Sequence, residues 1–153
     1  MNSLFVLCCF LVLGKFAFGE EVKFSLCPGE ENKCDIHSLR VNPCKEAATD
    51  SPCRIKRGKS ASISFDYTPH FSGETIGNRA YWTGGVMDIA FPGMNSDACT
   101  YTTCPLVSGT KTTYTYDLVV SKNYPTRIFD VKWKVWNEHD EQCCFILSIK
   151  LVK

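Results

Sequence analysis

Long hydrophobic runs, helical periodicity and excess charge are all scarce in this sequence of 153 residues. No stretch after residue 19 approaches the run of about 18 apolar residues that a membrane-spanning helix needs. The 17 Lys and Arg residues nearly balance the 16 Asp and Glu residues, and loss of Lys15 with an N-terminal leader would make them equal. The chain therefore has neither a predicted transmembrane helix nor the basic footprint of a nucleic-acid-binding protein.

Motifs for catalysis are absent as well. The three histidines, His37, His70 and His139, belong to no nucleophile or zinc-protease motif, because the sequence contains neither G-x-S-x-G nor H-E-x-x-H. The glycines form no phosphate-binding loop. The sequence therefore predicts a protein that is not an enzyme and that uses no cofactor.

The first 19 residues have the features of a signal peptide. Leu4 to Leu13 is a run of ten apolar residues, and small residues follow at Ala17 and Gly19. An apolar run of this length before small residues is typical of a cleaved leader, and it is too short to span a bilayer. We therefore expect a signal peptide over 1–19, secretion to the extracellular space, and a single domain over 20–153.

Eight cysteines remain after the leader, and an even number in a small secreted domain indicates disulfide bonds. Spacing alone leaves roughly a hundred ways to pair them. Cys99 and Cys104 have the C-x4-C spacing of a zinc site, but no pair of histidines completes the ligand set. The C-x-x-C sequence of a redox couple is also missing. We therefore expect a local disulfide between Cys99 and Cys104, and no metal.

The rest of the chain alternates between apolar and polar residues, which is typical of half-buried strands. The apolar faces of four such runs consist of Ala61, Ile63, Phe65 and Tyr67; Met87, Ile89 and Phe91; Phe129, Val131, Trp133 and Val135; and Phe145, Leu147, Ile149 and Leu151. Turn residues separate the runs, and no stretch of about ten residues shows helical periodicity. About six to eight short strands of this kind predict an all-β sandwich of two antiparallel sheets.

Two alternatives stay open at the level of pattern. The inner faces of the sandwich either fill a core or splay apart around an apolar cavity for a hydrophobic ligand. The basic cluster Arg54, Lys56, Arg57 and Lys59 is either a solvated turn or a patch that docks to an acidic partner, a receptor or an anionic membrane surface.

The order of the cysteines and their neighbours resembles that of one family. The segments that carry the resemblance are, in chain order, VKFSLC, RVNPC, SPCRIKRG, FPGMNSDAC, CPLVSG, KNYP, VKWKV and CCFILSIKLV, and they extend from about Val22 to Val152. This order is similar to the ML lipid-recognition family, in particular to its Niemann–Pick type C sterol-transfer branch, its arthropod relatives and the group 2 mite allergens. The resemblance implies an immunoglobulin-like sandwich with an internal apolar cavity. It also implies the disulfides Cys27–Cys144, Cys44–Cys53 and Cys99–Cys104.

The resemblance further implies the position of a lipid site. Phe91, Val120 and Tyr124 match residues that line or guard the entrance to the cavity in the sterol carriers. The hydroxyl of Tyr124 is expected to meet the polar head of the lipid. The expected cavity wall consists of Ile63, Phe65, Ile89, Val131 and Trp133.

Three departures from the family pattern modify these expectations. The rim segment FPGM lacks the proline-rich sequence of the sterol carriers, which predicts a mouth of different stiffness and ligand choice. No N-x-S/T glycosylation sequence is present, which favours secretion over sorting to the lysosome lumen. Cys34 and Cys143 are additional cysteines, and we expect them to pair; the alternative is that Cys34 bonds a second chain.

The sequence therefore predicts a secreted, monomeric, non-catalytic carrier that binds a sterol or related hydrophobic lipid, such as a fatty acid, between its sheets and transfers it. An alternative is an innate-immune or chemosensory protein that presents microbial or fatty-acid-like lipid to a receptor. In that case the basic cluster would contact anionic headgroups. A third alternative is a structural or interaction protein with a filled core and no ligand.

Overall fold

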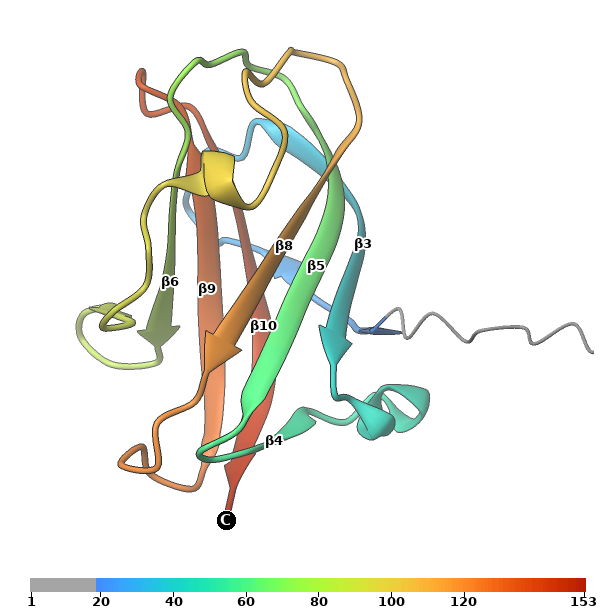
Figure 1. Ribbon diagram of the computed structural model, residues 1–153, viewed down its shortest axis with the longest axis vertical. Coiled ribbons are helices and arrows are strands. Elements are labelled where there is room, and N and C mark those ends of the chain that lie inside the picture. Colours follow the sequence, from blue (N-terminus) through green and yellow to red (C-terminus); the bar gives the residue numbers. More distant parts are fainter. Residues whose placement is uncertain (1–18) are drawn as a thin grey trace, which may run out of the picture.

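The computed structural model describes residues 19–153 as two β-sheets packed face to face (Figure 1). The signal peptide expected over 1–19 lies outside the described residues except for Gly19. In the four-stranded sheet the strand order is β1-β3-β5-β8. Its strands are β1 (Glu20–Glu21), β3 (Cys34–Asn42), β5 (Ser60–Pro69) and β8 (Thr112–Val119).

The six-stranded sheet has the order β2-β10-β9-β6-β7, with β4 added beside β10. Its strands are β2 (Ser25–Leu26), β4 (Cys53–Lys56), β6 (Gly77–Thr83), β7 (Ile89–Ala90), β9 (Ile128–Trp136) and β10 (Gln142–Val152). Neighbouring strands are antiparallel except for β4, which runs parallel to the last residues of β10. The predicted all-β sandwich of antiparallel sheets is confirmed, with this one parallel pair as an exception.

Alternation in the sequence explains how the long strands face the interior. In β9, Val131 and Trp133 are buried while Asp130 is exposed, because successive side chains on a strand point to opposite faces. The same pattern buries alternate residues of β5 and β10. The sequence predicts that Ile89 faces the interior, but both residues of β7 are exposed. Strand β7 has only two residues and lies at the edge of its sheet, so only one side of it is paired.

Helical structure is limited to two short 3-10 turns within residues 19–153. These are η1 (Lys45–Thr49) and η2 (Ala98–Thr100). A short helical turn is the most that the sequence predicts around residues 44–50. None of the helices in the described part of the chain has the length and hydrophobicity to cross a membrane.

Disulfides connect the two sheets and their flanking segments. The bonded pairs are Cys27–Cys144, Cys34–Cys143, Cys44–Cys53 and Cys99–Cys104. Cys143 and Cys144 are neighbours on β10 and point to opposite faces. Cys143 therefore reaches β3 in the other sheet, whereas Cys144 bonds the N-terminal segment. Both of these bridges lie at the end of the sandwich where β3 and β10 begin.

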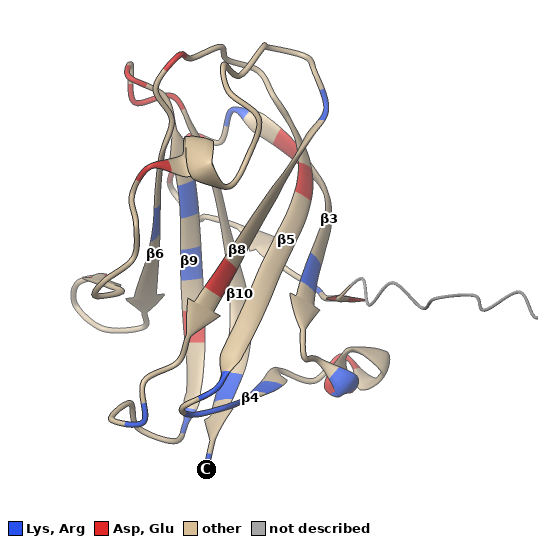
Figure 2. Ribbon diagram, viewed as in Figure 1, with Lys and Arg blue, Asp and Glu red and all other residues tan. Residues whose placement is uncertain are grey.

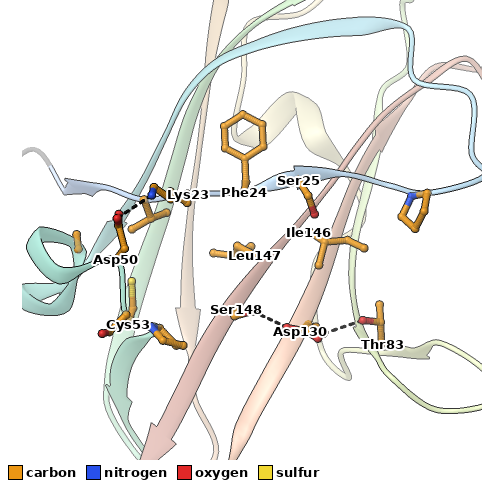
Figure 3. A pocket seen from close by; sticks show the side chains of 15 residues that line it. Lys23, Phe24, Ser25, Asp50, Cys53, Thr83, Asp130, Ile146, Leu147 and Ser148 are labelled. Carbon is orange, nitrogen blue, oxygen red and sulfur yellow. Dashed lines mark hydrogen bonds and ion pairs between the residues drawn. The ribbon is translucent and has the colours of Figure 1, made fainter.

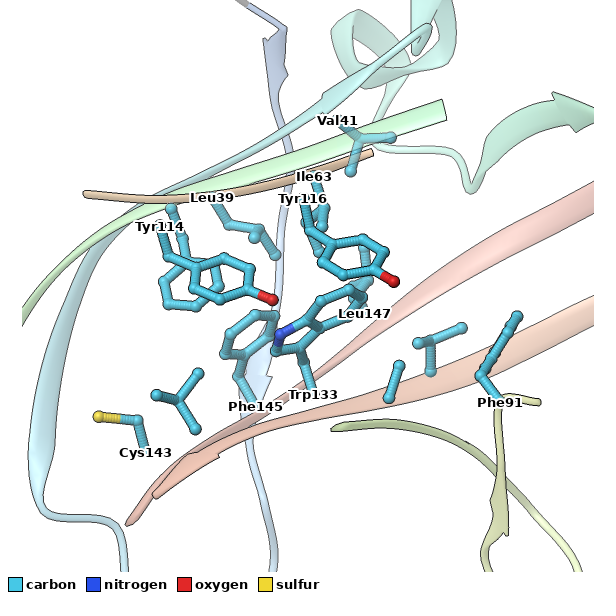
Figure 4. Packing of buried hydrophobic residues seen from close by; sticks show 14 of the residues in the cluster. Leu39, Val41, Ile63, Phe91, Tyr114, Tyr116, Trp133, Cys143, Phe145 and Leu147 are labelled. Atoms are coloured by element: carbon cyan, nitrogen blue, oxygen red, sulfur yellow. The ribbon is translucent and has the colours of Figure 1, made fainter. Parts of the chain in front are cut away.

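The interior changes character along the strands, as Figure 4 shows. At the end where β3, β8 and β10 begin, four fully buried rings fill the space; we call this the aromatic end. Its rings are Phe65, Tyr67, Tyr114 and Phe145. Phe65 stacks on Tyr114 at 4.8 Å between ring centroids and meets Phe145 edge to face at 5.0 Å. The opposite end, where the same strands finish, is lined mainly by aliphatic side chains, and we call it the cavity end.

Candidate functional site

A small cavity of about 50 Å³ lies between the sheets at the cavity end. Residues from both sheets and from the segments beside them surround it: Val41, Ile55, Ala61, Ser62, Ile63, Phe91, Leu118, Val120, Val131, Trp133, Leu147 and Ile149. None of these side chains carries a charge, and all but two of them are hydrocarbon. A lining of this kind favours an apolar ligand over water or an ion.

Trp133 separates the cavity from the aromatic end. Its indole contacts Tyr114 and Tyr116 edge to face, at 5.9 and 5.6 Å between ring centroids. The other side of the ring lines the cavity together with Val131, which lies two residues earlier on the same face of β9. The aromatic end therefore forms the floor of the cavity.

A second group of rings lies beside the cavity, at its mouth, and we call it the rim cluster. It consists of Trp82, Phe91, Tyr124 and Phe129. Trp82 is at its centre, with Phe91 and Tyr124 each at 4.8 Å in edge-to-face contact. Phe91 is 2% exposed and belongs to both the rim cluster and the cavity wall. A change in its position would therefore alter both the rim cluster and the shape of the cavity.

Hydrogen bonds to backbone carbonyls hold two segments together beside the mouth. Arg57 Nη1 donates to the carbonyl of Tyr124 at 2.6 Å. Gly58 N donates to the carbonyl of Val120 at 2.6 Å, and Val120 N donates to the carbonyl of Lys59 at 3.0 Å. The turn between β4 and β5 thus fixes the loop 120–127, which carries Tyr124 to the rim.

The structure brings together five of the eight residues that the sequence analysis assigns to the site. Those that line the cavity are Ile63, Phe91, Val120, Val131 and Trp133. Tyr124 lies one layer outside, against Phe91 at 5.9 Å, and Phe65 belongs to the filled aromatic end. Ile89 is corrected from a wall residue to a surface residue, because it is 59% exposed on the edge strand β7.

Several wall residues were not anticipated as part of a site. Alternation in the sequence places Leu147 and Ile149 on an inner face. Nothing in the sequence distinguishes a residue of the cavity wall from a residue of the filled core. Ile55 reaches the cavity because β4 pairs with β10 in the register Ile55 to Leu151, which no local pattern predicts. Trp82 occurs in a short strand without clear alternation, so its place at the centre of the rim cluster was missed.

A larger groove of about 500 Å³ lies on the outer face of the six-stranded sheet (Figure 3). The N-terminal segment, the residues around Asp50 and strand β10 enclose it. Charged and hydroxyl side chains line much of it, among them the ion pair Lys23–Asp50 at 2.7 Å and Ser148, which donates to Asp130 at 2.5 Å. These groups retain water, so the inner cavity is the better candidate for a lipid.

Cations without an ion-pair partner among the described residues gather at the cavity end, near the C-terminus in Figure 2. They include Lys56, Arg57, Lys59, Lys122 and Arg127. Arg54 of the predicted basic cluster differs, because it pairs with Glu46 at 3.9 Å. The turn 57–59 and the loop 120–127 contain no acidic residue. The positive charge beside the mouth is therefore uncompensated.

Comparison with known proteins identifies the family. Residues 21–151 match the family model of the ML domain. The chain belongs to the ML domain family. Proteins of this family bind lipids and are not enzymes, so the predicted family and the predicted lack of catalysis are both confirmed.

Relatives of this ML-domain protein occur in insects and mammals. It is 36% identical to the MD-2-related lipid-recognition protein of Manduca sexta over 146 residues, which is 93% of each chain. It is 30% identical to NPC intracellular cholesterol transporter 2 of Sus scrofa over 142 residues, which is 91% of this chain and 89% of that protein. The Niemann–Pick type C2 protein from Japanese carpenter ant has the same fold. Its TM-score is 0.74 at 20% identity, over 85% of this chain and 99% of that one.

Proposed function

We propose that this ML-domain protein carries a sterol or a related hydrophobic lipid between its two sheets and releases it chemically unchanged. The observation that carries the proposal is the apolar cavity at one end of the sandwich, with the aromatic rim cluster beside it. Burial of apolar surface contributes about 25 cal/mol per Å², so a sterol-sized ligand needs few polar contacts to bind. The relative named as a cholesterol transporter supports this ligand class.

The lipid is proposed to contact Ile63, Phe91, Val120, Val131 and Trp133. Tyr124 would approach its polar end from the rim. The cavity of about 50 Å³ is far smaller than the roughly 300 Å³ or more of typical small-molecule pockets. Binding therefore requires the mouth and the aliphatic side chains of the cavity end to move apart.

A second candidate function is recognition of an anionic microbial or fatty-acid-like lipid for presentation to a receptor. The unpaired cations at the cavity end favour it, because an acidic headgroup would lie beside them while its chains enter the cavity. In this view Lys56, Arg57 and Lys59 contact the headgroup or a membrane. Arg54 contributes less, since Glu46 already compensates its charge.

We further propose that the protein is secreted as a monomer, with the lysosome lumen as the alternative. The expected leader over 1–19 supports entry into the secretory pathway. The disulfides support it as well, because such bonds persist in oxidising compartments.

Native mass spectrometry of the purified protein tests the proposal by identifying any lipid that remains bound. Titrations with dehydroergosterol, cis-parinaric acid and lipopolysaccharide then compare a sterol, a fatty acid and an acidic glycolipid. Absence of binding to all three overturns the carrier function. A preference for lipopolysaccharide that weakens in Lys59→Ala and not in Lys111→Ala, a control outside the cavity end, supports the second candidate.

A further inference from the structure

The segment Gly84–Gly93 contributes Phe91 to the cavity wall and is paired with the sheet along one side only. It contains the edge strand β7, which pairs only with β6 through Trp82 to Ile89 and Tyr81 to Ala90. One further backbone bond, from Phe91 N to the carbonyl of Ala80 at 2.9 Å, continues this pairing. The other mouth segment, 120–127, is held by bonds to Arg57, Gly58 and Leu151.

Glycines delimit this segment at both ends. Gly84 has a φ of 100° and Gly93 a φ of 74°, which is a conformation that glycine adopts without strain. An added Cβ at either position would meet nothing within 4 Å, so neither glycine is enclosed by its neighbours. Beyond Gly93 the chain is anchored again, because Met94 Sδ accepts from Ala80 N at 3.2 Å. The geometry is that of a flap with Phe91 near its base.

The tip of the flap is apolar and faces water. Val86 is fully exposed, Met87 is 78% exposed and Ile89 is 59% exposed. Three large apolar side chains exposed together on one loop are unusual. Such a group often marks a place that contacts another apolar surface. Other residues of the described chain, 19–153, leave most of their surface uncovered.

One cluster of charges holds the flap against the sheet. Asp88 Oδ2 lies 2.6 Å from Lys132 Nζ, and the same ammonium group lies 2.7 Å from Glu30 Oε1. Lys134 also pairs with Glu30. Burial alone would raise the pKa of Glu30, but hydrogen bonds from Lys132 and Lys134 lower the pKa to about 2. The cluster therefore stays charged at neutral pH.

We propose that Gly84–Gly93 is a lid over the lipid cavity, latched by the ion pair between Asp88 and Lys132. Release of the latch lets Phe91 swing outward, so that the mouth widens and the apolar tip contacts the incoming lipid. This inference rests on the proposed carriage of lipid between the sheets. It explains how the mouth opens to admit a sterol to a cavity of about 50 Å³, while the aliphatic side chains of the cavity end move apart to make room for it.

Stopped-flow uptake of cis-parinaric acid tests the latch with Asp88→Asn, which removes the ion pair and leaves the bonds of Glu30 intact. We expect uptake to be about two- to five-fold faster than in the parent protein, in line with the strength of a partly exposed ion pair. Asp117→Asn is the control, because it removes the same charge from an exposed position on β8 and should leave the rate unchanged. Equal rates in Asp88→Asn and the parent overturn the proposal.

A variant with the opposite expected sign guards against a general loosening of the fold. Gly85→Ala stiffens the backbone next to Gly84, at one end of the flap. The added Cβ would have only an ordinary contact with the carbonyl of Met87 at 3.7 Å. We expect it to slow uptake by about two-fold. Faster uptake in both variants would refute the lid.

Hydrogen exchange at the Phe91 amide separates failure of the latch from failure of the carrier function. The amide is bonded to Ala80 and should exchange faster in Asp88→Asn, while amides of β9 keep their rates. If the parent protein binds no lipid, the carrier function fails, and this exchange measurement still decides whether the latch exists. Unchanged exchange at Phe91 overturns the latch.

Discussion

The aromatic end and the cavity end of the sandwich are built from the same strands, β3, β5, β8, β9 and β10, yet they differ in how the space between the sheets is used. At the aromatic end, Phe65, Tyr114 and Phe145 fill the interior in stacked and edge-to-face contacts, and Cys34–Cys143 joins the sheets. At the cavity end, shorter aliphatic side chains face one another and leave a void. Side-chain size along each strand thus divides one core into a rigid half and an expandable half.

The strongest test of this division is removal of a ring at the aromatic end. Phe65→Ala deletes a fully buried side chain that contacts Tyr67, Tyr114 and Phe145. We expect the free energy of unfolding to fall by about 3–5 kcal/mol, because a large cavity cannot collapse between stacked rings. Urea denaturation measures the loss. A loss below about 1 kcal/mol would mean that the aromatic end is not the rigid half.

A matching substitution at the mouth should act on binding rather than on folding. Phe91→Ala removes the ring shared by the rim cluster and the cavity wall. We expect the affinity for dehydroergosterol to fall about tenfold or more, since each 1.4 kcal/mol of lost apolar contact weakens binding tenfold. Tyr124→Ala, one layer further out, should have a smaller effect. If both variants bind sterol as the parent does, these residues do not belong to the site.

The disulfide between the sheets, Cys34–Cys143, should stabilise the fold by less than the length of the loop that it closes suggests. Cys34→Ala with Cys143→Ala removes a link between residues 109 apart in sequence. Cys27–Cys144 closes nearly the same loop and remains, so we expect a loss of about 2 kcal/mol, at the lower end of the usual range. Thermal unfolding measures it.

Non-reducing peptide mapping of the unmodified protein is the companion experiment for this bridge. It should recover Cys34 bonded to Cys143 within one chain. A free thiol at either residue, or a covalent dimer through Cys34, would contradict the intramolecular bond.

The last test concerns acid. Glu30 has a folded pKa of about 2, below its ordinary 4.5, because hydrogen bonds from Lys132 and Lys134 outweigh its burial. A lowered pKa stabilises the fold above pH 4.5, and this contribution declines as the pH falls towards 2. The free energies of unfolding of the parent and of Glu30→Gln, measured between pH 5 and pH 2, should therefore converge as the pH falls. A constant difference would show that Glu30 acts through packing.

Alternation was sufficient to predict β5, β9 and β10, because residues such as Val131 and Trp133 face one interior over a regular stretch. It failed at Ile89, where a strand of two residues has no second neighbour to enforce the pattern. The parallel contact of Ile55 with β10 depends on how distant segments meet, so local sequence does not encode it. The family resemblance, rather than periodicity, pointed to Phe91 and Val120.

Whether the interior is hollow could not be predicted from pattern at all. Ile63 and Phe65 are successive inner-face residues of β5 with similar hydrophobicity, yet one lines the cavity and the other fills the aromatic end. The difference arises from the size of the partners across the sandwich. Those partners come from β9 and β10, which are far away in sequence.

Strand β10 has a consequence for biosynthesis. It pairs with β9 on one side and with both β2 and β4 on the other, and it carries one cysteine of each of two disulfides. It is also the last strand of the sandwich to leave the ribosome. The six-stranded sheet is therefore completed only after β10 has been synthesised. Folding that depends on such distant pairings is slow, so apolar strand faces are exposed to aggregation for longer before the sheet is complete.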